Sequence, residues 1–259
     1  MVLDSPNDGG PADCAQVLVI IAGQSNALGY TLGSADLPPH LRTPIARVQI
    51  WDPAARAFAP LRPGVNTGAP NNPRNWGPEA QLAFRWSQEH ACGGLRLVKY
   101  ARGETGLAAD PDDRDWSPAS AGDVWDKATS EIDAAKTALK TEGLSLRVDA
   151  VFWMQGETDA QDDEKAAAYR QNLTDLVMRI RTRWGDEQTD VYVGQIDRPP
   201  GSRGWEQVRQ AQAATAASVP DVDLVDTDPF PRQAADGVHL TGQGQIRLGD
   251  GFYEQYRAR

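Results

Sequence analysis

The fold is decided by residues 17–26, VLVIIAGQSN, an apolar run that ends in Gly23, Gln24, Ser25 and Asn26. The run is rich in β-branched residues, which is typical of a strand buried on both faces of a parallel sheet. Such a strand delivers the residue after its carboxyl end to the sheet edge where open α/β folds bind their ligands. Ser25 is therefore a candidate nucleophile, although a serine at this place is also typical of a helix N-cap.

Strands and helices alternate along the rest of the chain. Further apolar runs predict strands at 48–51, 95–101, 150–155, 191–196 and 222–225. Helical patterns cover 78–92, 123–142, 163–184, 205–217 and 242–256. This alternation predicts βαβ units and a parallel sheet with helices on both faces. No internal repeat or linker divides the chain, so we expect a flexible lead-in over 1–16 and one domain over 17–259.

The charge of the chain excludes some classes of partner. Its 259 residues carry a formal net charge of -10 and a sequence pI of about 4.8. Nucleic acids and anionic membrane surfaces both attract basic patches, so we expect neither as a partner. No apolar run approaches the roughly 20 residues of a membrane span. The acidic residues within 110–115 could bind Ca²⁺, but they do not follow the spacing of an EF-hand loop, so a solvated turn is the preferred interpretation. We expect neither a metal nor a cofactor.

The two cysteines, Cys14 and Cys92, each precede a predicted strand by three residues. If those strands are parallel neighbours, the cysteines lie about 4.8 Å apart, which is within reach of a disulfide. The alternative is two unpaired thiols, with Cys92 buried at a helix end. A disulfide would favour an oxidising compartment. We expect a secreted or periplasmic protein whose signal peptide is absent from this sequence, and a cytoplasmic location stays open.

A serine hydroxyl becomes a good nucleophile only when a base takes its proton, and histidine is the usual base. The chain has three histidines, His40, His90 and His239. His239 ends the stretch Asp236-Gly237-Val238-His239, just before the last predicted helix. An aspartate three residues before a histidine can reach the imidazole through one turn and fix its tautomer. Asp236 and His239 are therefore the candidate partners of Ser25.

Two predicted strands end in groups that could bind an oxyanion. Gly103 offers a backbone N–H that can approach a ligand closely, and Gln155 offers a side-chain amide. A simple turn is the alternative interpretation of the glycine. Glu157 and Asp159 form a carboxylate pair of the kind that glycosidases use. The neighbouring Gln155 favours a supporting hydrogen-bonding role for both carboxylates instead.

Three blocks carry a resemblance to a known superfamily. Gly23-Gln24-Ser25-Asn26, Trp153-x-Gln155-Gly156-Glu157-x-Asp159 and Asp236-x-x-His239 resemble the blocks of the SGNH hydrolases. Within that superfamily, they are most similar to the sialate O-acetylesterase-like branch, also called carbohydrate esterase family 6, which includes acetylxylan esterase-like proteins. The resemblance implies a flavodoxin-like, three-layer α/β/α fold around a central parallel sheet of about five strands.

The same resemblance implies roles for individual residues. It makes Ser25 the nucleophile, His239 the base and Asp236 the acid that orients it. It forms the oxyanion hole from the Ser25 N–H, the Gly103 N–H and the Gln155 side chain. The supporting residues are Gln24, Asn26 and Glu157.

The expected function is that of a serine esterase that removes O-acetyl groups from a carbohydrate through an acetyl-enzyme. The expected partner is an acetylated carbohydrate, such as xylan or a sialic acid. One alternative is an SGNH lipase or thioesterase that acts on other short-chain esters, and another is a catalytically inactive carbohydrate-binding scaffold. Trp76, Trp116 and Trp205 lie in or beside irregular stretches, where they either stack on sugar rings or anchor the loops. The oligomeric state is left open.

Overall fold

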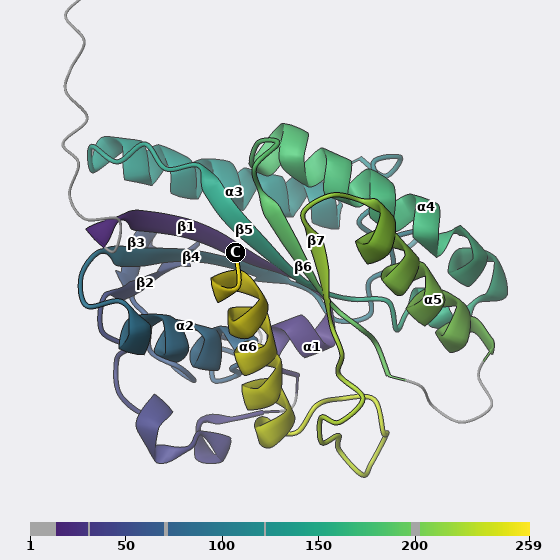
Figure 1. The fold of residues 1–259 in the computed structure, drawn as a ribbon, viewed down its shortest axis with the longest axis horizontal. Coiled ribbons are helices and arrows are strands. Elements are labelled where there is room, and N and C mark those ends of the chain that lie inside the picture. The colour runs from purple at the N-terminus through teal and green to yellow at the C-terminus, as the bar shows by residue number, and fades with distance from the viewer. Residues whose placement is uncertain (1–13, 31, 70–71, 122, 198–202) are drawn as a thin grey trace, which may run out of the picture.

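The structure is a computed structural model that describes residues 14–30, 32–69, 72–121, 123–197 and 203–259. In these residues the chain forms a seven-stranded sheet in the order β3-β2-β4-β1-β5-β6-β7. The strands are β1 (Gln16–Gly23), β2 (Val48–Asp52), β3 (Ala57–Pro60), β4 (Gly94–Ala101), β5 (Val148–Met154), β6 (Asp190–Gly194) and β7 (Val222–Val225). Helices lie on both faces of the sheet, which makes three layers (Figure 1). The predicted α/β/α architecture is confirmed.

The strand order explains both the expected and the observed size of the sheet. The strands β4-β1-β5-β6-β7 are all parallel and follow the flavodoxin-like order 2-1-3-4-5 when they are numbered among themselves. The expected count of about five strands matches this parallel set but is too low for the whole sheet, which has two further strands. Strand β2 continues the parallel sheet beyond β4, and β3 then pairs with β2 in antiparallel orientation at the edge.

Six α-helices connect or flank the strands of the described chain. They are α1 (Ser25–Leu28), α2 (Pro78–Glu89), α3 (Val124–Thr141), α4 (Asp163–Arg179), α5 (Arg203–Ser218) and α6 (Gly242–Arg257). Helices α2 and α6 pack together on one face of the sheet, and α3, α4 and α5 cover the other (Figure 1). A π-helix at Ile180–Trp184 extends α4, and short 3₁₀ turns lie at Ser34–Asp36, Pro39–Leu41 and Asp159–Gln161.

Local sequence accounts for where several helices begin. Pro78 opens α2 at its first turn, where the missing N–H has no helical partner to lose. The Asp162 side chain caps α4 by accepting hydrogen bonds from the N–H groups of Glu164 and Lys165. Thr241 caps α6 by accepting from the Gly244 N–H. This last cap fixes the start of α6 three residues after His239.

The three tryptophans of the irregular stretches are buried, so they anchor loops. Trp76 donates its indole N–H to the Gly33 carbonyl at 3.0 Å. Trp116 lies edge-on to the ring of Trp153, with ring centroids 5.0 Å apart. Trp205 is buried at the start of α5. Sugar stacking by these rings is excluded, because none of them offers an open face.

The cysteines lie at the amino-terminal edge of the sheet, where β1 and β4 begin. Cys14 and Cys92 form a disulfide with a Cα–Cα distance of 4.6 Å. The bond follows from the register, because Gln16 pairs with Gly94 two residues further along each strand. The disulfide interpretation is confirmed. Of the expected lead-in, residues 1–13 lie outside the described residues, and Cys14 to Gln16 already belong to the folded sheet edge.

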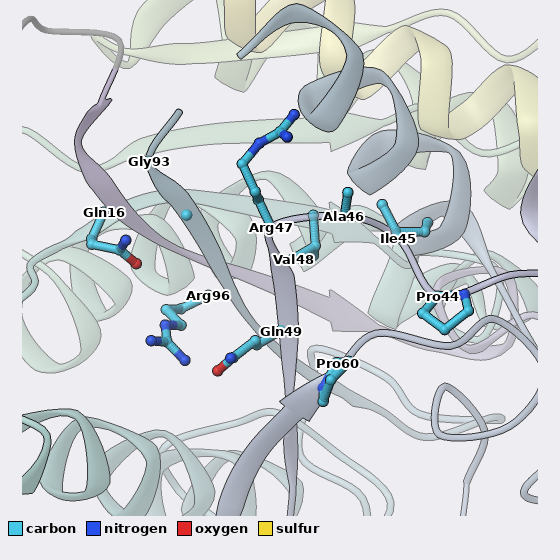
Figure 2. A pocket seen from close by; sticks show the side chains of 11 residues that line it. Gln16, Pro44, Ile45, Ala46, Arg47, Val48, Gln49, Pro60, Gly93 and Arg96 are labelled. Atoms are coloured by element: carbon cyan, nitrogen blue, oxygen red, sulfur yellow. The ribbon is translucent and has the colours of Figure 1, made fainter. Parts of the chain in front are cut away.

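A cavity of about 420 Å³ lies at this same amino-terminal edge (Figure 2). Its lining includes Gln16, Gly94 and Arg96 from the first residues of β1 and β4, together with Val48 and Gln49 from the start of β2. Parallel α/β sheets bind their ligands at the opposite, carboxyl edge. The cavity is therefore distinct from the place to which β1 delivers Ser25.

Candidate active site

Ser25 lies where the chain leaves the centre of the sheet. Gly23 ends β1 with φ 139°, and the N–H of Gln24 donates to the Met154 carbonyl at the end of β5. A Cβ at position 23 would lie 2.0 Å from the Met154 oxygen, so only glycine permits this crossing. Ser25 follows as the first residue of α1 and is 5% exposed. The strand order reverses between β1 and β5, so Ser25 lies at the topological switch point.

Asp236 and His239 form a hydrogen-bonded pair in the loop before α6. The Asp236 Oδ2 atom lies 2.8 Å from Nδ1 of His239. The other carboxylate oxygen accepts the backbone N–H groups of Val238 and His239, at 2.8 and 2.9 Å. These bonds hold the carboxylate against Nδ1 of the ring. No hydrogen bond to a described residue uses Nε2, so this nitrogen is available for proton transfer.

Asn26 joins this loop to the serine. Its Nδ2 donates to the Val238 carbonyl at 3.2 Å, and its Oδ1 accepts the Leu240 N–H at 2.9 Å. The structure therefore holds the peptide groups on both sides of His239 against the residue that follows Ser25. Among the described residues, no hydrogen bond joins the Ser25 hydroxyl directly to the imidazole. Such bonds are often long in ligand-free hydrolases and tighten when substrate binds.

Gly103 lies beside Ser25 at the end of β4. The Arg102 N–H donates to the Gly23 carbonyl at 3.1 Å, which carries the β1–β4 pairing to the sheet edge. A Cβ on Gly103 would lie 3.9 Å from the Ser25 Cβ atom. No acceptor among the described residues takes the backbone N–H of either Ser25 or Gly103. Two backbone N–H groups without an acceptor among the described residues, that of Ser25 itself and that of the neighbouring Gly103, thus lie close together.

Gln155 does not fit its expected role as an oxyanion donor. Its side chain is fully buried, and its Nε2 donates to Asp159 Oδ2 at 2.6 Å and to the Thr105 carbonyl at 2.9 Å. These two bonds use both amide hydrogens. The Oε1 atom accepts the Tyr169 hydroxyl at 3.1 Å. Gln155 therefore connects the end of β5 to the loop after Gly103 through hydrogen bonds, and it has no amide hydrogen left to donate to a substrate.

The carboxylates of Asp159 and Glu157 accept hydrogen bonds from other groups of the protein. Asp159 accepts the backbone N–H groups of Leu107 and Ala108 at 3.0 and 3.1 Å, in addition to the Gln155 amide. Glu157 accepts Asn26 Nδ2 at 2.8 Å. Burial raises the pKa of both carboxyls above the usual range. Neither carboxylate is open to solvent as a glycosidase pair would require, and both take supporting positions.

Gln24 completes this buried layer. Its side chain is 3% exposed, and its amide oxygen lies 3.3 Å from Gln155 Nε2. The same amide lies near the backbone N–H groups of Gly156 and Thr158. Gln24 therefore connects the turn before Ser25 with the turn after β5.

The other two histidines lie in unrelated surroundings. His40 contacts Gln81 of α2 through Nε2 at 3.1 Å. His90 follows the end of α2, where its ring stacks on Trp86 at 4.4 Å between centroids. Within the described part of the chain, no group of three or more His, Cys, Asp or Glu side chains could hold a metal ion. No described helix is long and apolar enough to cross a membrane.

Comparison with known proteins identifies the family of this chain. A family model described as carbohydrate esterase, sialic acid-specific acetylesterase, matches residues 15–258. The chain belongs to this family of carbohydrate esterases. A probable carbohydrate esterase of Arabidopsis thaliana is 29% identical over 109 residues, which span 42% of this chain and 40% of that relative.

Several solved structures share the fold of this chain. A protein from Arabidopsis thaliana has a TM-score of 0.72 at 20% identity and covers 94% of this chain and 99% of its own. NanS has a TM-score of 0.69 at 16% identity, over 95% of this chain and 99% of its own. A carbohydrate acetylesterase from Xanthomonas citri has a TM-score of 0.60 at 18% identity, over 90% and 54% of the two chains.

Proposed function

We propose that this protein is a serine esterase that removes O-acetyl groups from a carbohydrate. The observation that carries the proposal is the Asp236–His239 pair, whose loop is hydrogen-bonded to Asn26, the residue next to Ser25. Membership in the carbohydrate esterase family supports the reaction class. The family description, sialic acid-specific acetylesterase, and the name of the Xanthomonas citri carbohydrate acetylesterase support acetyl esters of sugars as the class to test first.

In the proposed mechanism, His239 removes the Ser25 proton through Nε2, and the serine oxygen attacks the acetyl carbonyl. The sugar hydroxyl leaves with a proton returned by His239, and an acetyl group remains on Ser25. Water that His239 activates then attacks this ester, releases acetate and restores the serine. The reaction needs no metal for these steps.

Asp236 keeps the imidazole in the required tautomer. Partial burial acts to raise the pKa of Asp236, but the hydrogen bonds from His239 and from the Val238 N–H outweigh burial and hold that pKa below its usual range. The carboxylate is thus ionised at neutral pH. An ionised carboxylate stabilises the imidazolium that forms when His239 accepts the serine proton.

The N–H groups of Ser25 and Gly103 are the proposed donors to the tetrahedral oxyanion. Both are backbone donors fixed by β1 and β4, so they need little reorganisation during the reaction. Removal of one such donor typically reduces the rate about 10²- to 10³-fold. Gln155 contributes indirectly, because it holds the loop that follows Gly103.

The disulfide supports a place for this reaction outside the reducing cytosol. Disulfides persist in secreted and periplasmic proteins. We therefore propose secretion or a periplasmic location, which fractionation of the native organism tests directly.

The experiment is acetate release from acetylated xylo-oligosaccharides and from O-acetylated sialic acid, with wild-type protein and Ser25→Ala. Wild type should release acetate, and Ser25→Ala should lose at least about 10³-fold in kcat/KM while it keeps the same circular dichroism spectrum. Full activity of the variant would overturn the proposal. A preference for longer acyl chains over acetyl in a series of aryl esters would favour a lipase or thioesterase. Failure of a fluorophosphonate to label Ser25 would favour an inactive scaffold.

A further inference from the structure

The ring of Tyr30 lies beside the ring of His239. Their centroids are 4.5 Å apart, and the two planes are inclined by 40°. Tyr30 is 47% exposed, whereas the other described tryptophans, tyrosines and phenylalanines are buried or only partly exposed. A single exposed aromatic is ordinary on a protein surface. Its contact with the candidate base is what gives this one significance.

The backbone holds Tyr30 at a fixed distance from Ser25. The N–H groups of Gly29 and Tyr30 both donate to the Ser25 carbonyl, at 2.9 and 3.0 Å. Gly29 is left-handed, with φ 86°, and a Cβ there would lie 1.7 Å from the Trp76 carbonyl oxygen. The close approach of the Trp76 carbonyl thus requires glycine at position 29, and the left-handed turn that this glycine allows sets the position of the Tyr30 backbone.

The side chain of Tyr30 is not used by the fold. Its hydroxyl makes no hydrogen bond to a described residue, and about half of its surface stays in water. Aromatic rings with one apolar face and one wet end are suited to ligands that are themselves partly apolar and partly polar. A pyranose ring is such a ligand, since its C–H face is apolar and its hydroxyls point outward.

We propose that Tyr30 is a substrate-binding residue that stacks on the sugar ring which carries the acetyl ester. The inference rests on the proposed function. A ring stacked there lies next to His239, so its acetylated hydroxyl can receive the proton that the imidazole returns when the sugar leaves. Tyr30 would then select for esters of ring alcohols over esters of small open-chain alcohols.

The test compares two acetate esters by pH-stat titration: an acetylated xylo-oligosaccharide and ethyl acetate, which has no ring to stack. Wild-type hydrolysis of both esters establishes the proposed function independently of Tyr30. Tyr30→Ala should then raise KM for the oligosaccharide about five- to tenfold, as expected for loss of one aromatic contact. Its kcat on both substrates and its KM for ethyl acetate should change less than about twofold.

Two controls separate binding from other roles. Tyr30→Phe keeps the ring and should keep the wild-type KM for the oligosaccharide. Met178→Ala removes another exposed apolar side chain, on α4, and should leave KM and kcat unchanged for both substrates. Equal losses on both esters in Tyr30→Ala, or a shifted pH profile with ethyl acetate, would mean that Tyr30 acts on His239 and would overturn the proposal. An unchanged KM for the oligosaccharide would overturn it as well.

Discussion

Asn26 holds His239 from both sides, because its one amide group bonds the carbonyl of Val238 and the N–H of Leu240. The same amide nitrogen donates to the buried Glu157. Ser25 and His239 are far apart in the sequence, and this side chain connects the residue next to Ser25 with the loop that carries His239. The position of the base therefore depends on the residue next to the nucleophile.

Asn26→Ala should impair catalysis more than a typical surface substitution does. Loss of the amide frees the His239 loop, and a displacement of about 1 Å at a reacting group can reduce the rate about 10²-fold. We expect kcat/KM for an acetate ester to fall by about that factor, together with the rate of labelling by a fluorophosphonate. Gln171→Ala on the exposed face of α4 is the control and should match wild type. Wild-type kinetics in Asn26→Ala would refute the role of the amide.

Glu157→Gln should stabilise the fold increasingly as the pH rises. Burial raises the pKa of Glu157, so this carboxyl has a higher pKa in the folded chain than in the unfolded chain. The unfolded state therefore releases its proton first, and the folded state loses stability as the pH rises between the two values. Glutamine keeps an acceptor for Asn26 and has no charge to bury.

Thermal melts from about pH 4 to about pH 8 measure this difference. The Tm of Glu157→Gln relative to wild type should increase across the series, while the exposed Glu187→Gln should show no such trend. A relative Tm that decreases with rising pH has the opposite sign and would contradict the assignment.

Lys99→Met should be strongly destabilising. Lys99 and Glu79 form a buried ion pair of 2.8 Å, and the Lys99 ammonium also donates to the carbonyls of Leu28 and Thr67. Leu28 is the last residue of α1, the helix that begins at Ser25. The ammonium therefore stabilises the end of this short helix. Removal of one partner from a buried pair leaves an uncompensated charge, which typically costs about 3–5 kcal/mol.

Urea unfolding of three proteins tests this pair: wild type, Lys99→Met, and the double variant Lys99→Met/Glu79→Gln. The double variant should recover part of the loss, because its remaining partner carries no charge. A loss below about 1 kcal/mol in Lys99→Met would show that the pair is not the buried contact described.

Replacement of both cysteines by serine should lower stability and spare activity. The disulfide closes a loop with a sequence separation of 78. In the chain-entropy model a loop of this length contributes about 4–5 kcal/mol through the unfolded state. The bond lies at the amino edge of β1 and β4, so kcat/KM at 25 °C should stay within about twofold of wild type. A Tm equal to that of oxidised wild type would argue against the bond.

The sequence was sufficient for the main strands, because each is an apolar run that a two-sided parallel sheet must bury. It was not sufficient for β3, since Ala57–Pro60 is short, half-exposed and ends in proline, as an edge strand often does. The five-residue π-helix at Ile180–Trp184 also lies inside one continuous helical pattern, so periodicity alone could not separate it from α4.

At the site, the sequence suggested Ser25, Asp236 and His239 as partners, but it could not assign the hydrogen bonds of the surrounding side chains. Gln155 has the right chemistry for an oxyanion donor, yet Asp159 and Thr105 take both of its amide hydrogens. The bonds of Asn26 span more than two hundred residues, so no local pattern predicts them. The sequence could not tell which aromatic side chains are exposed, and the structure shows that Tyr30 is exposed whereas Trp76, Trp116 and Trp205 are buried.

The most direct measurement is mass spectrometry of the enzyme quenched with acid during the first turnover of an aryl acetate. The proposed acetyl-enzyme mechanism predicts one added acetyl group on the peptide that contains Ser25, and none on the same peptide from Ser25→Ala. Continued hydrolysis by wild type with no acetyl group at Ser25, and with Ser25→Ala equally active, would contradict it.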